Sequence, residues 1–536
     1  MNERMPVRHS RRSGGHNVAR ANRKFLPAQA HHSPAWVSAL VEPNWVPWAI
    51  VALAAGLRVL LLGIKPPHFD EGMNGWLVDQ IVKTGFYRYD PANEHGPLHF
   101  YVLFLSQTLF GRNVWALRLP VVLVSTACVY LAMRFEPLVG RTVSRFAALA
   151  LAVSPGFIFY GRYSIHEVWL QFFSMLFILG LLGMWRCGTR KYLWFSTAAL
   201  AGMILTKETY IIHVGCVLLA LPVAMISNKL NRVPDARPAK QEWGKVDFLV
   251  VMAVASAAIA FFYSGTFFYW EGIKGLYQCF AMWIETAQAG RGHEKNEWYW
   301  LMLIGRYEWP IALGLLGSVL CQFYKSASLR YIAIYGVGTF ITYTILPYKT
   351  PWCIISAVWP FAFLFGAVLV SLASRQLRLA WVTSIVVICV SLGSAISLNY
   401  FRCTSDAEPY VYVQTYNDVF KLTRPVLALA KTNPANFHLT GHIIRSSAHP
   451  LPWMLGEFPR IQYYENRKTP ANPDGDLIVV EERRIPEIES KLRQAYYTST
   501  IRIRAYQDTS KVYFNAKTFM QFFPGRSPDF PEKDSL

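Results

Sequence analysis

The sequence predicts a polytopic α-helical membrane protein with a C-terminal extracytoplasmic α/β domain, and three observations support this prediction. First, 53% of the 536 residues are hydrophobic and 16% are charged, whereas roughly a quarter of the residues in a soluble domain are charged. Second, long apolar segments recur between residues 46 and 399. Third, short strand-like and helical segments of mixed charge alternate beyond residue 400. An ordinary soluble enzyme is therefore excluded.

The first 42 residues are predicted to form a disordered basic tail on the cytoplasmic side. Residues 4–24 are rich in arginine and too polar to bury a core. Arg11 and Arg12 could also be read as a twin-arginine export signal, but no apolar run follows until residue 46, which disfavours this alternative.

Residues 43–400 are predicted to form a transmembrane domain, because about eleven of their segments are long and apolar enough to cross a bilayer. These segments are residues 46–64, 114–133, 145–161, 168–185, 192–206, 210–227, 247–269, 299–323, 331–346, 352–372 and 379–399. Pro97–Phe110 is also apolar but too short, so we expect it to form an interfacial helix.

The charge distribution predicts the orientation of the chain. The net charge of +20 comes largely from basic residues in alternate loops, among them residues 134–145, 186–191, 229–245 and 375–378. By the positive-inside rule these loops and the N-terminus face the cytoplasm. We therefore interpret the positive charge as a topology signal, because a nucleic-acid-binding protein would need a contiguous basic face on a soluble fold. With an odd number of spans, residues 401–536 form the extracytoplasmic domain.

On this topology, several charged motifs emerge at the non-cytoplasmic surface. The long outer loop 65–113 carries Asp70 and Glu71, and carboxylates at a membrane surface commonly mark substrate or ion sites. Neighbouring aromatic residues could lower the local dielectric and prepare Asp70 as a general base. The alternative is a solvated loop without function. Glu71, next to Asp70, and Glu167 are the other candidate catalytic carboxylates.

Four cationic side chains, Arg162, His166, Lys207 and Lys349, are predicted at the same surface. Such a group could bind a lipid-linked phosphate and stabilise the charge on a leaving phosphate. Structural interpretations stay open, because Arg162 and Lys207 could form ion pairs with neighbouring carboxylates and Lys349 could extend to the interface from an aromatic belt.

A divalent metal ion is a further candidate ligand of the outer loops. The imidazole and carboxylate groups of His68, Asp70, Glu71, His95, His99 and His166 could contribute to such a site. Their spacing is not diagnostic, because Pro97 separates His95 from His99. The sequence thus leaves the need for a metal unknown and indicates no other cofactor.

Six short strings, taken in order, resemble one known family. They are Tyr-Arg-Tyr-Asp-Pro at 87–91, His-Gly-Pro at 95–97, Ser-Pro at 154–155 with Gly-Arg at 161–162, Thr-Lys-Glu at 206–208, Tyr-Lys-Thr-Pro-Trp at 348–352 and Pro-Leu-Pro-Trp at 450–453. With the Asp-Glu pair, they make residues 46–525 similar to the GT-C glycosyltransferases. Within these the chain resembles the protein O-mannosyltransferase and aminoarabinose-transferase group, in particular its prokaryotic mannosyltransferase-like branch.

The resemblance implies an inverting hexosyltransferase that takes its sugar from a polyprenyl-phosphate carrier. Asp70 matches the family's catalytic acidic position, and Glu167 matches the second position, where relatives often have Asp. We expect the matching strings to supply the residues that bind acceptor or sugar, namely Tyr89, His95, Glu208, Tyr348 and Trp352. His449–Trp453 is expected to be a packed loop.

The predicted function is transfer of a sugar, a mannose-like hexose, from a polyprenyl-phosphate donor to an extracytoplasmic acceptor by a multi-pass protein of the cytoplasmic membrane. The acceptor is unknown, membrane lipids surround the protein, and no nucleic acid is expected. The alternatives are a non-catalytic translocator of lipid-linked sugars and a membrane scaffold. A translocator should line the bilayer midplane with charge, whereas the polar motifs gather at one surface.

Overall fold

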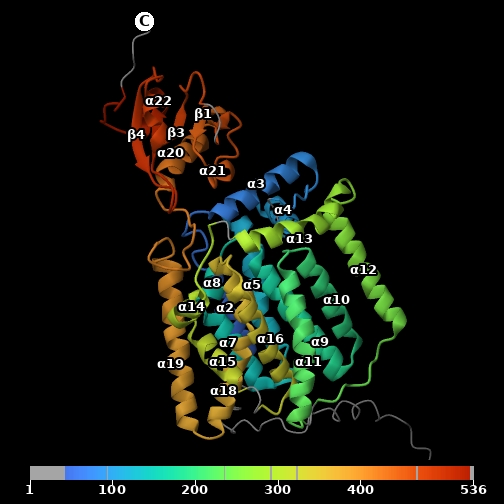
Figure 1. Cartoon of the computed structure of the whole chain (residues 1–536). Coiled ribbons are helices and arrows are strands. Elements are labelled where there is room, and N and C mark those ends of the chain that lie inside the picture. The colour runs from blue at the N-terminus through green and yellow to red at the C-terminus, as the bar shows by residue number, and fades with distance from the viewer. Residues whose placement is uncertain are drawn as a thin grey trace, which may run out of the picture.

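The computed structural model describes residues 43–92, 95–233, 236–289, 292–320, 324–465 and 469–530. The predicted N-terminal tail, residues 1–42, lies outside these ranges. The described chain forms a long helical bundle with a smaller α/β unit beyond one end (Figure 1). Residues 419–530, which contain the sheet, are called the C-terminal unit below.

Apolar runs of helix-forming residues build the bundle. Its helices are α2 (Val46–Val59), α5 (Val114–Met133), α6 (Glu136–Val139), α7 (Arg141–Val153), α8 (Pro155–Tyr160), α9 (Glu167–Cys187), α10 (Arg190–Ile204), α11 (Tyr210–Leu230), α12 (Lys245–Tyr263), α14 (Tyr299–Tyr307), α15 (Trp309–Val319), α16 (Ala327–Ile345), α17 (Ile354–Val358), α18 (Pro360–Ala373) and α19 (Leu377–Ile396).

Among the described residues, five helices are long and apolar enough to cross a membrane. A sixth span results if Pro351–Val358 and Pro360–Ala373, which meet at a bend of 52°, are counted together. Three shorter apolar helices accompany them, at Val46–Val59, Leu98–Phe110 and Trp309–Val319. The protein is therefore a multi-pass membrane protein by these helices, and the number of about eleven spans stays a prediction.

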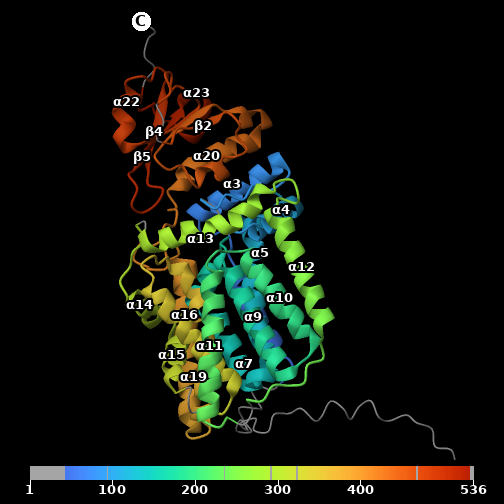
Figure 2. The ribbon, with the colours of Figure 1, turned by 45° about the vertical axis from the view of Figure 1, so that its right-hand side comes forward.

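Three helices lie across the end of the bundle that faces the C-terminal unit (Figure 2). They are α3 (Phe69–Thr84), α4 (Leu98–Phe110) and α13 (Glu271–Ala289). The 13 residues of α4 extend only about 20 Å, less than the hydrocarbon core of a bilayer. Its length agrees with the interfacial helix predicted from Pro97–Phe110.

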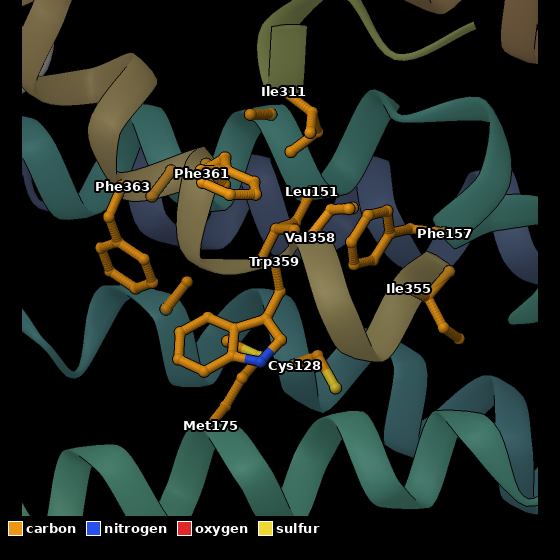
Figure 3. Packing of buried hydrophobic residues seen from close by; sticks show 14 of the residues in the cluster. Cys128, Leu151, Phe157, Met175, Ile311, Ile355, Val358, Trp359, Phe361 and Phe363 are labelled. Carbon is orange, nitrogen blue, oxygen red and sulfur yellow. The ribbon is translucent and has the colours of Figure 1, made fainter. Parts of the chain in front are cut away.

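Large side chains of α17 and α18 fill the centre of the bundle (Figure 3). Trp359 is completely buried, and its indole N–H donates to Oγ of Ser174, 3.1 Å away on α9. Phe361 and Phe363 are also fully buried. Gly314 on α15 lets the backbones approach, since a Cβ there would lie 1.8 Å from the carbonyl oxygen of Phe361. Small residues commonly permit such close helix packing in membranes.

The basic loops meet at the opposite end of the bundle. Arg186 donates to the carbonyl of Arg237, and Arg330 donates to Oγ of Ser227. Arg190 forms an ion pair with Asp247 at the start of α12. The loops around residues 186–191 and 229–245, which the sequence assigned to one side of the membrane, therefore contact each other.

The C-terminal unit contains a five-stranded sheet in the order β2-β1-β3-β5-β4. Its elements are α20 (Val419–Thr432), β1 (Gly441–Ile444), α21 (Leu451–Met454), β2 (Ile461–Tyr463), β3 (Leu477–Glu481), α22 (Ile485–Glu489), β4 (Tyr496–Ile501), β5 (Ser510–Asn515) and α23 (Ala516–Phe519). Strand β1 pairs in parallel with β2 and β3, whereas β5 pairs antiparallel with β3 and β4. All five residues of β3 are buried, as expected for a central strand covered on both faces.

Candidate active site

The site is built around the first turn of α3, at the end of the bundle below the C-terminal unit. His68 precedes the helix, and its Nδ1 accepts a hydrogen bond from the backbone N–H of Asp70 at 3.1 Å. In return, Glu71 accepts from the backbone N–H of His68 at 2.9 Å. This reciprocal cap satisfies two free amides at the helix start. It thereby fixes the turn that carries both predicted carboxylates.

The ring of His68 is neutral and has a defined tautomer. Its Nε2 lies 2.9 Å from the carbonyl oxygen of Tyr412, which can only accept a hydrogen bond. Nε2 is therefore assigned the proton, and Nδ1 is the acceptor for Asp70. Burial lowers the pKa of His68 below its ordinary value. His68 thus positions α3 and has no free ring nitrogen for a metal.

Glu71 is held in a fully buried ion pair. Both of its oxygens accept from Arg118, at 2.8 and 2.7 Å, and Oε1 also accepts from the backbone N–H of Ser164 at 2.9 Å. Burial acts to raise the pKa of Glu71, but the attraction to Arg118 outweighs it, and the pKa lies below its ordinary value. An acceptor cannot reach this carboxylate. The contacts assign Glu71 a positioning role between α3 and α5 instead of the predicted catalytic role.

Asp70, in contrast, is accessible. Its side chain is 32% exposed, and its Oδ2 lies 3.7 Å from Nδ1 of His68. The charge of Asp70 acts on five further ionisable side chains from separate parts of the chain, which are Tyr163, His293, Tyr348, His449 and Arg504. Of the two neighbouring carboxylates, Asp70 is therefore the one that a substrate can reach.

The second predicted carboxylate, Glu167, begins α9 and pairs with Lys207 in the turn after α10. Their side chains are 4% and 6% exposed. Burial acts to lower the pKa of Lys207, but the adjacent Glu167 carboxylate outweighs this effect and the pKa is raised. Lys207 therefore stays a cation in a nearly dry position, which is the setting in which a fixed charge acts most strongly on an anion.

Tyr348 connects the two carboxylate regions. It lies within electrostatic range of Asp70, Glu167 and Lys207, and burial raises its pKa. Its ring contacts that of His293 at a centroid distance of 5.0 Å. Asp70 and the Glu167–Lys207 pair, which belong to different parts of the chain, thus both act on the Tyr348 phenol.

Lys349 and Trp352 follow Tyr348 in the sequence but point to different places. Nζ of Lys349 donates to the carbonyl of Leu346 at 2.6 Å and to that of Lys295 at 3.3 Å. These contacts hold Lys349 at the C-terminal end of α16. The ring of Trp352 contacts the ring of His68 edge-on at a centroid distance of 5.9 Å. Because His68 lies next to Asp70, Trp352 is also near that carboxylate.

A second polar cluster contains three of the residues predicted to bind acceptor or sugar. Glu208 accepts from the hydroxyl of Tyr89 at 3.3 Å and pairs with Nδ1 of His95 at 2.9 Å. His95 stacks on Trp283 of α13 at 5.5 Å, and Trp283 in turn contacts Tyr348 edge-on at 6.3 Å. The two clusters are therefore contiguous through aromatic rings.

His166 is placed among other histidines. Its ring lies 4.4 Å from that of His99 and 4.9 Å from that of His95. Burial, followed by repulsion from His99, lowers the pKa of His166 well below its ordinary value, so the ring is neutral. It does not supply the positive charge expected from the sequence. Across the described residues, no group of three or more His, Cys, Asp or Glu side chains is arranged to hold a metal ion.

Arg162 is engaged with the end of α2. Its guanidinium donates to four backbone carbonyls in the stretch 57–61 and lies 4.7 Å from the centre of the Tyr400 ring. The last carbonyls of a helix lack internal partners, and Arg162 satisfies them. These contacts give Arg162 a structural role, so Lys207 is the predicted cation best placed for a donor phosphate.

Sequence reasoning missed residues that the fold brings to Asp70 from far along the chain. His449 and Arg504 come from the C-terminal unit, and His293 comes from the segment after α13. The sequence marked His449 only as part of the expected packed loop His449–Trp453, and no local pattern indicated that His449, His293 or Arg504 lies near Asp70.

Comparisons with known proteins agree with this architecture. A family model described as dolichyl-phosphate-mannose-protein mannosyltransferase matches residues 94–261. A search of curated proteins gave no match. The crystal structure of ArnT from Cupriavidus metallidurans in the apo state is similar, with 16% identity, a TM-score of 0.55, and coverage of 90% of this chain and 98% of ArnT.

ArnT from Cupriavidus metallidurans bound to undecaprenyl phosphate matches in the same way. The identity is 15%, the TM-score is 0.56, and the alignment covers 89% of this chain and 98% of ArnT. At this identity the likeness establishes the fold. The family model over residues 94–261 agrees with the resemblance to the GT-C glycosyltransferases.

Proposed function

We propose that this protein transfers a sugar from a polyprenyl-phosphate carrier to an acceptor on the extracytoplasmic side of the cytoplasmic membrane. The observation that carries the proposal is that accessible Asp70 and the buried Glu167–Lys207 pair both lie within electrostatic range of Tyr348. A similar structure holds undecaprenyl phosphate. This supports a polyprenyl-phosphate donor, and the family model supports a mannose-like hexose.

Asp70 acts as the general base in this proposal. The acceptor hydroxyl loses its proton to Asp70 while its oxygen bonds to the anomeric carbon. The bond between that carbon and the phosphate oxygen breaks on the opposite face, which inverts the configuration. The electron pair leaves with the polyprenyl phosphate, whose added negative charge is stabilised by Lys207.

Glu167 keeps Lys207 charged and in place. A lone ammonium would titrate readily when buried, but the pair with Glu167 keeps Lys207 charged and limits its movement. This positioning role needs a carboxylate at a fixed distance from Lys207.

The aromatic and polar groups around these residues form the proposed sugar and acceptor sites. Tyr348 and Trp352 offer ring faces near Asp70, and carbohydrate C–H groups pack well on such rings. Glu208 and His95 offer hydrogen-bonding groups in the neighbouring cluster. Both clusters lie at the bundle end opposite the basic loops, which supports an extracytoplasmic site and a cytoplasmic N-terminus.

The test is release of labelled sugar from its carrier by the purified full-length protein in detergent. Polyprenyl-phosphate mannose and polyprenyl-phosphate glucose are supplied separately, and Lys207→Gln is compared with wild type. We expect release from one donor by wild type and a loss of about 100-fold in Lys207→Gln. Binding of both donors without release by wild type would favour a translocator of lipid-linked sugars.

A further inference from the structure

The segment 449–453 of the C-terminal unit packs directly on α3. Gly72 and Gly75 are three residues apart on this helix and so share a face. A Cβ at Gly72 would lie 2.4 Å from Cβ of Pro450, and one at Gly75 would lie 2.5 Å from Cδ1 of Trp453. Real Cβ atoms do not approach so closely. The contact therefore depends on two glycines in the helix that carries Asp70.

Arg112 connects α3 with Trp453, the last residue of the segment 449–453. Its guanidinium donates to both oxygens of Asp79 on α3, at 3.0 and 2.9 Å. It also donates to the carbonyl oxygen of Trp453 and lies 5.1 Å from the centre of the Trp453 ring. One side chain thus joins α3 to the segment 449–453 by charge, hydrogen bond and ring contact.

At the start of α3, the C-terminal unit encloses Phe69, the residue before Asp70. The guanidinium of Arg504 lies 4.1 Å from the centre of the Phe69 ring and donates to Oγ of Ser447 at 2.8 Å. The ring of His449 meets the Phe69 ring edge-on at 5.5 Å. Two residues of the C-terminal unit therefore hold the backbone next to the proposed base.

Arg504 is a buried cation whose compensation comes from this site. It is 7% exposed, and within the described part of the chain it has no carboxylate at ion-pair distance. Burial and then Arg445 lower the pKa of Arg504 to about 10, whereas Asp70 and Glu465 act in the opposite direction. Arg504 is thus charged at neutral pH, and removing it would change the electrostatic surroundings of Asp70.

We propose that the C-terminal unit completes the active site, with the segment 449–453 holding α3 in place and Arg504 acting as a positioning residue for Asp70. The role of Arg504 rests on the proposed function. The docking of the segment 449–453 on α3 does not, because it is argued from packing alone. The two parts are therefore tested by separate measurements on the full-length protein.

Docking is tested by amide hydrogen exchange in detergent, without substrate. Gly75→Ala forces Trp453 away, so we expect faster exchange across α3. Gly56→Ala is the matched control, because a Cβ at this helical glycine meets nothing within 4 Å. Unchanged exchange of α3 in Gly75→Ala would overturn the docking.

The positioning role is tested by separating turnover from donor binding. In Arg504→Gln we expect kcat to fall about 100-fold, as misplaced groups of an active site commonly cause, while binding of polyprenyl phosphate at Lys207 is retained. Arg504→Lys should recover part of kcat, because it restores the charge. Arg502→Gln, an exposed arginine two residues earlier, should match wild type.

Unchanged kcat in Arg504→Gln would overturn the positioning role, and so would equal losses of kcat and of donor binding. If wild type transfers sugar from neither donor, the proposed function fails instead. The exchange result for Gly75→Ala would then still decide whether the C-terminal unit docks on α3.

Discussion

At the scale of single residues, Asp70 and Glu71 show how surroundings divide two neighbouring carboxylates. Glu71 is fully buried and accepts from Arg118, Ser164 and His68, whereas Asp70 is partly exposed. The sequence predicted Asp70 as the base but did not indicate that Glu71 is buried in an ion pair. The partner of Glu71 is 47 residues away, and nothing near Arg118 in the sequence indicates a contact with α3.

Glu71→Gln should be strongly destabilising. The substitution leaves the buried guanidinium of Arg118 without its charged partner, which typically costs about 3–5 kcal/mol. Thermal unfolding in detergent measures the effect. Glu136→Gln removes an exposed ion pair with Arg141 and should change stability by less than about 1 kcal/mol. If both variants lowered stability by the same small amount, the buried ion pair between Glu71 and Arg118 would be contradicted.

Stability should also depend on pH through His68. Its pKa is lowered in the folded protein, so as pH falls through about 6.5 the unfolded chain takes up a proton that the folded protein does not. The stability present above this pH is then lost as pH falls further. His68→Asn keeps a side-chain acceptor at the cap but does not titrate. The melting temperature should therefore fall less steeply with decreasing pH in His68→Asn than in wild type, and equal slopes would argue against a buried neutral ring.

At the scale of elements, the sequence predicted several helices closely. The apolar segment 114–133 coincides with α5, and segments 168–185 and 210–227 lie within α9 and α11. Three other predicted spans are interrupted where α8, α15 and α18 begin, each with a proline in the first turn, namely Pro155, Pro310 and Pro360. Proline lacks a backbone N–H and suits the first turn of a helix. Hydrophobicity does not reveal such breaks, and proline alone does not decide them, because Pro120 and Pro222 lie inside the continuous helices α5 and α11.

Close packing of α15 against α18 gives a prediction for one glycine. Gly314→Ala places a Cβ against the backbone of Phe361, which cannot move as a side chain can. We expect a loss of about 1–3 kcal/mol, as for other overpacked cores. Thermal unfolding of Gly314→Ala and Gly56→Ala in the same detergent checks this, and Gly56→Ala should unfold like wild type. An unchanged melting temperature in Gly314→Ala would mean that the helices lie further apart.

At the scale of the whole molecule, the basic loops and the proposed site lie at opposite ends of the helical bundle. The basic loops contact one another at one end, and α3, α4 and α13 cover the other (Figure 1). The positive-inside rule had assigned the basic loops to one side of the membrane and the loop that carries Asp70 to the other. It could not indicate that the C-terminal unit reaches Asp70, because that relation depends on how the chain returns after α19.

This arrangement predicts opposite sides of the membrane for two reporters. Alkaline phosphatase fused to the C-terminus of the full chain should be active, because it is exported with the C-terminal unit. Fused after Ser374, between α18 and α19, it should be inactive. The reverse pattern of activities would mean that the chain has the opposite orientation and that the proposed site faces the cytoplasm.

The central claim is that Asp70 is the base of a carrier-dependent sugar transfer. It is tested most directly by sugar release from labelled polyprenyl-phosphate donor, with wild type, Asp70→Asn and the exposed control Asp90→Asn side by side. Binding of the donor lipid is measured in the same samples. We predict release by wild type and Asp90→Asn, and none by Asp70→Asn, with equal donor binding in all three. Release by Asp70→Asn at the wild-type rate would contradict the account.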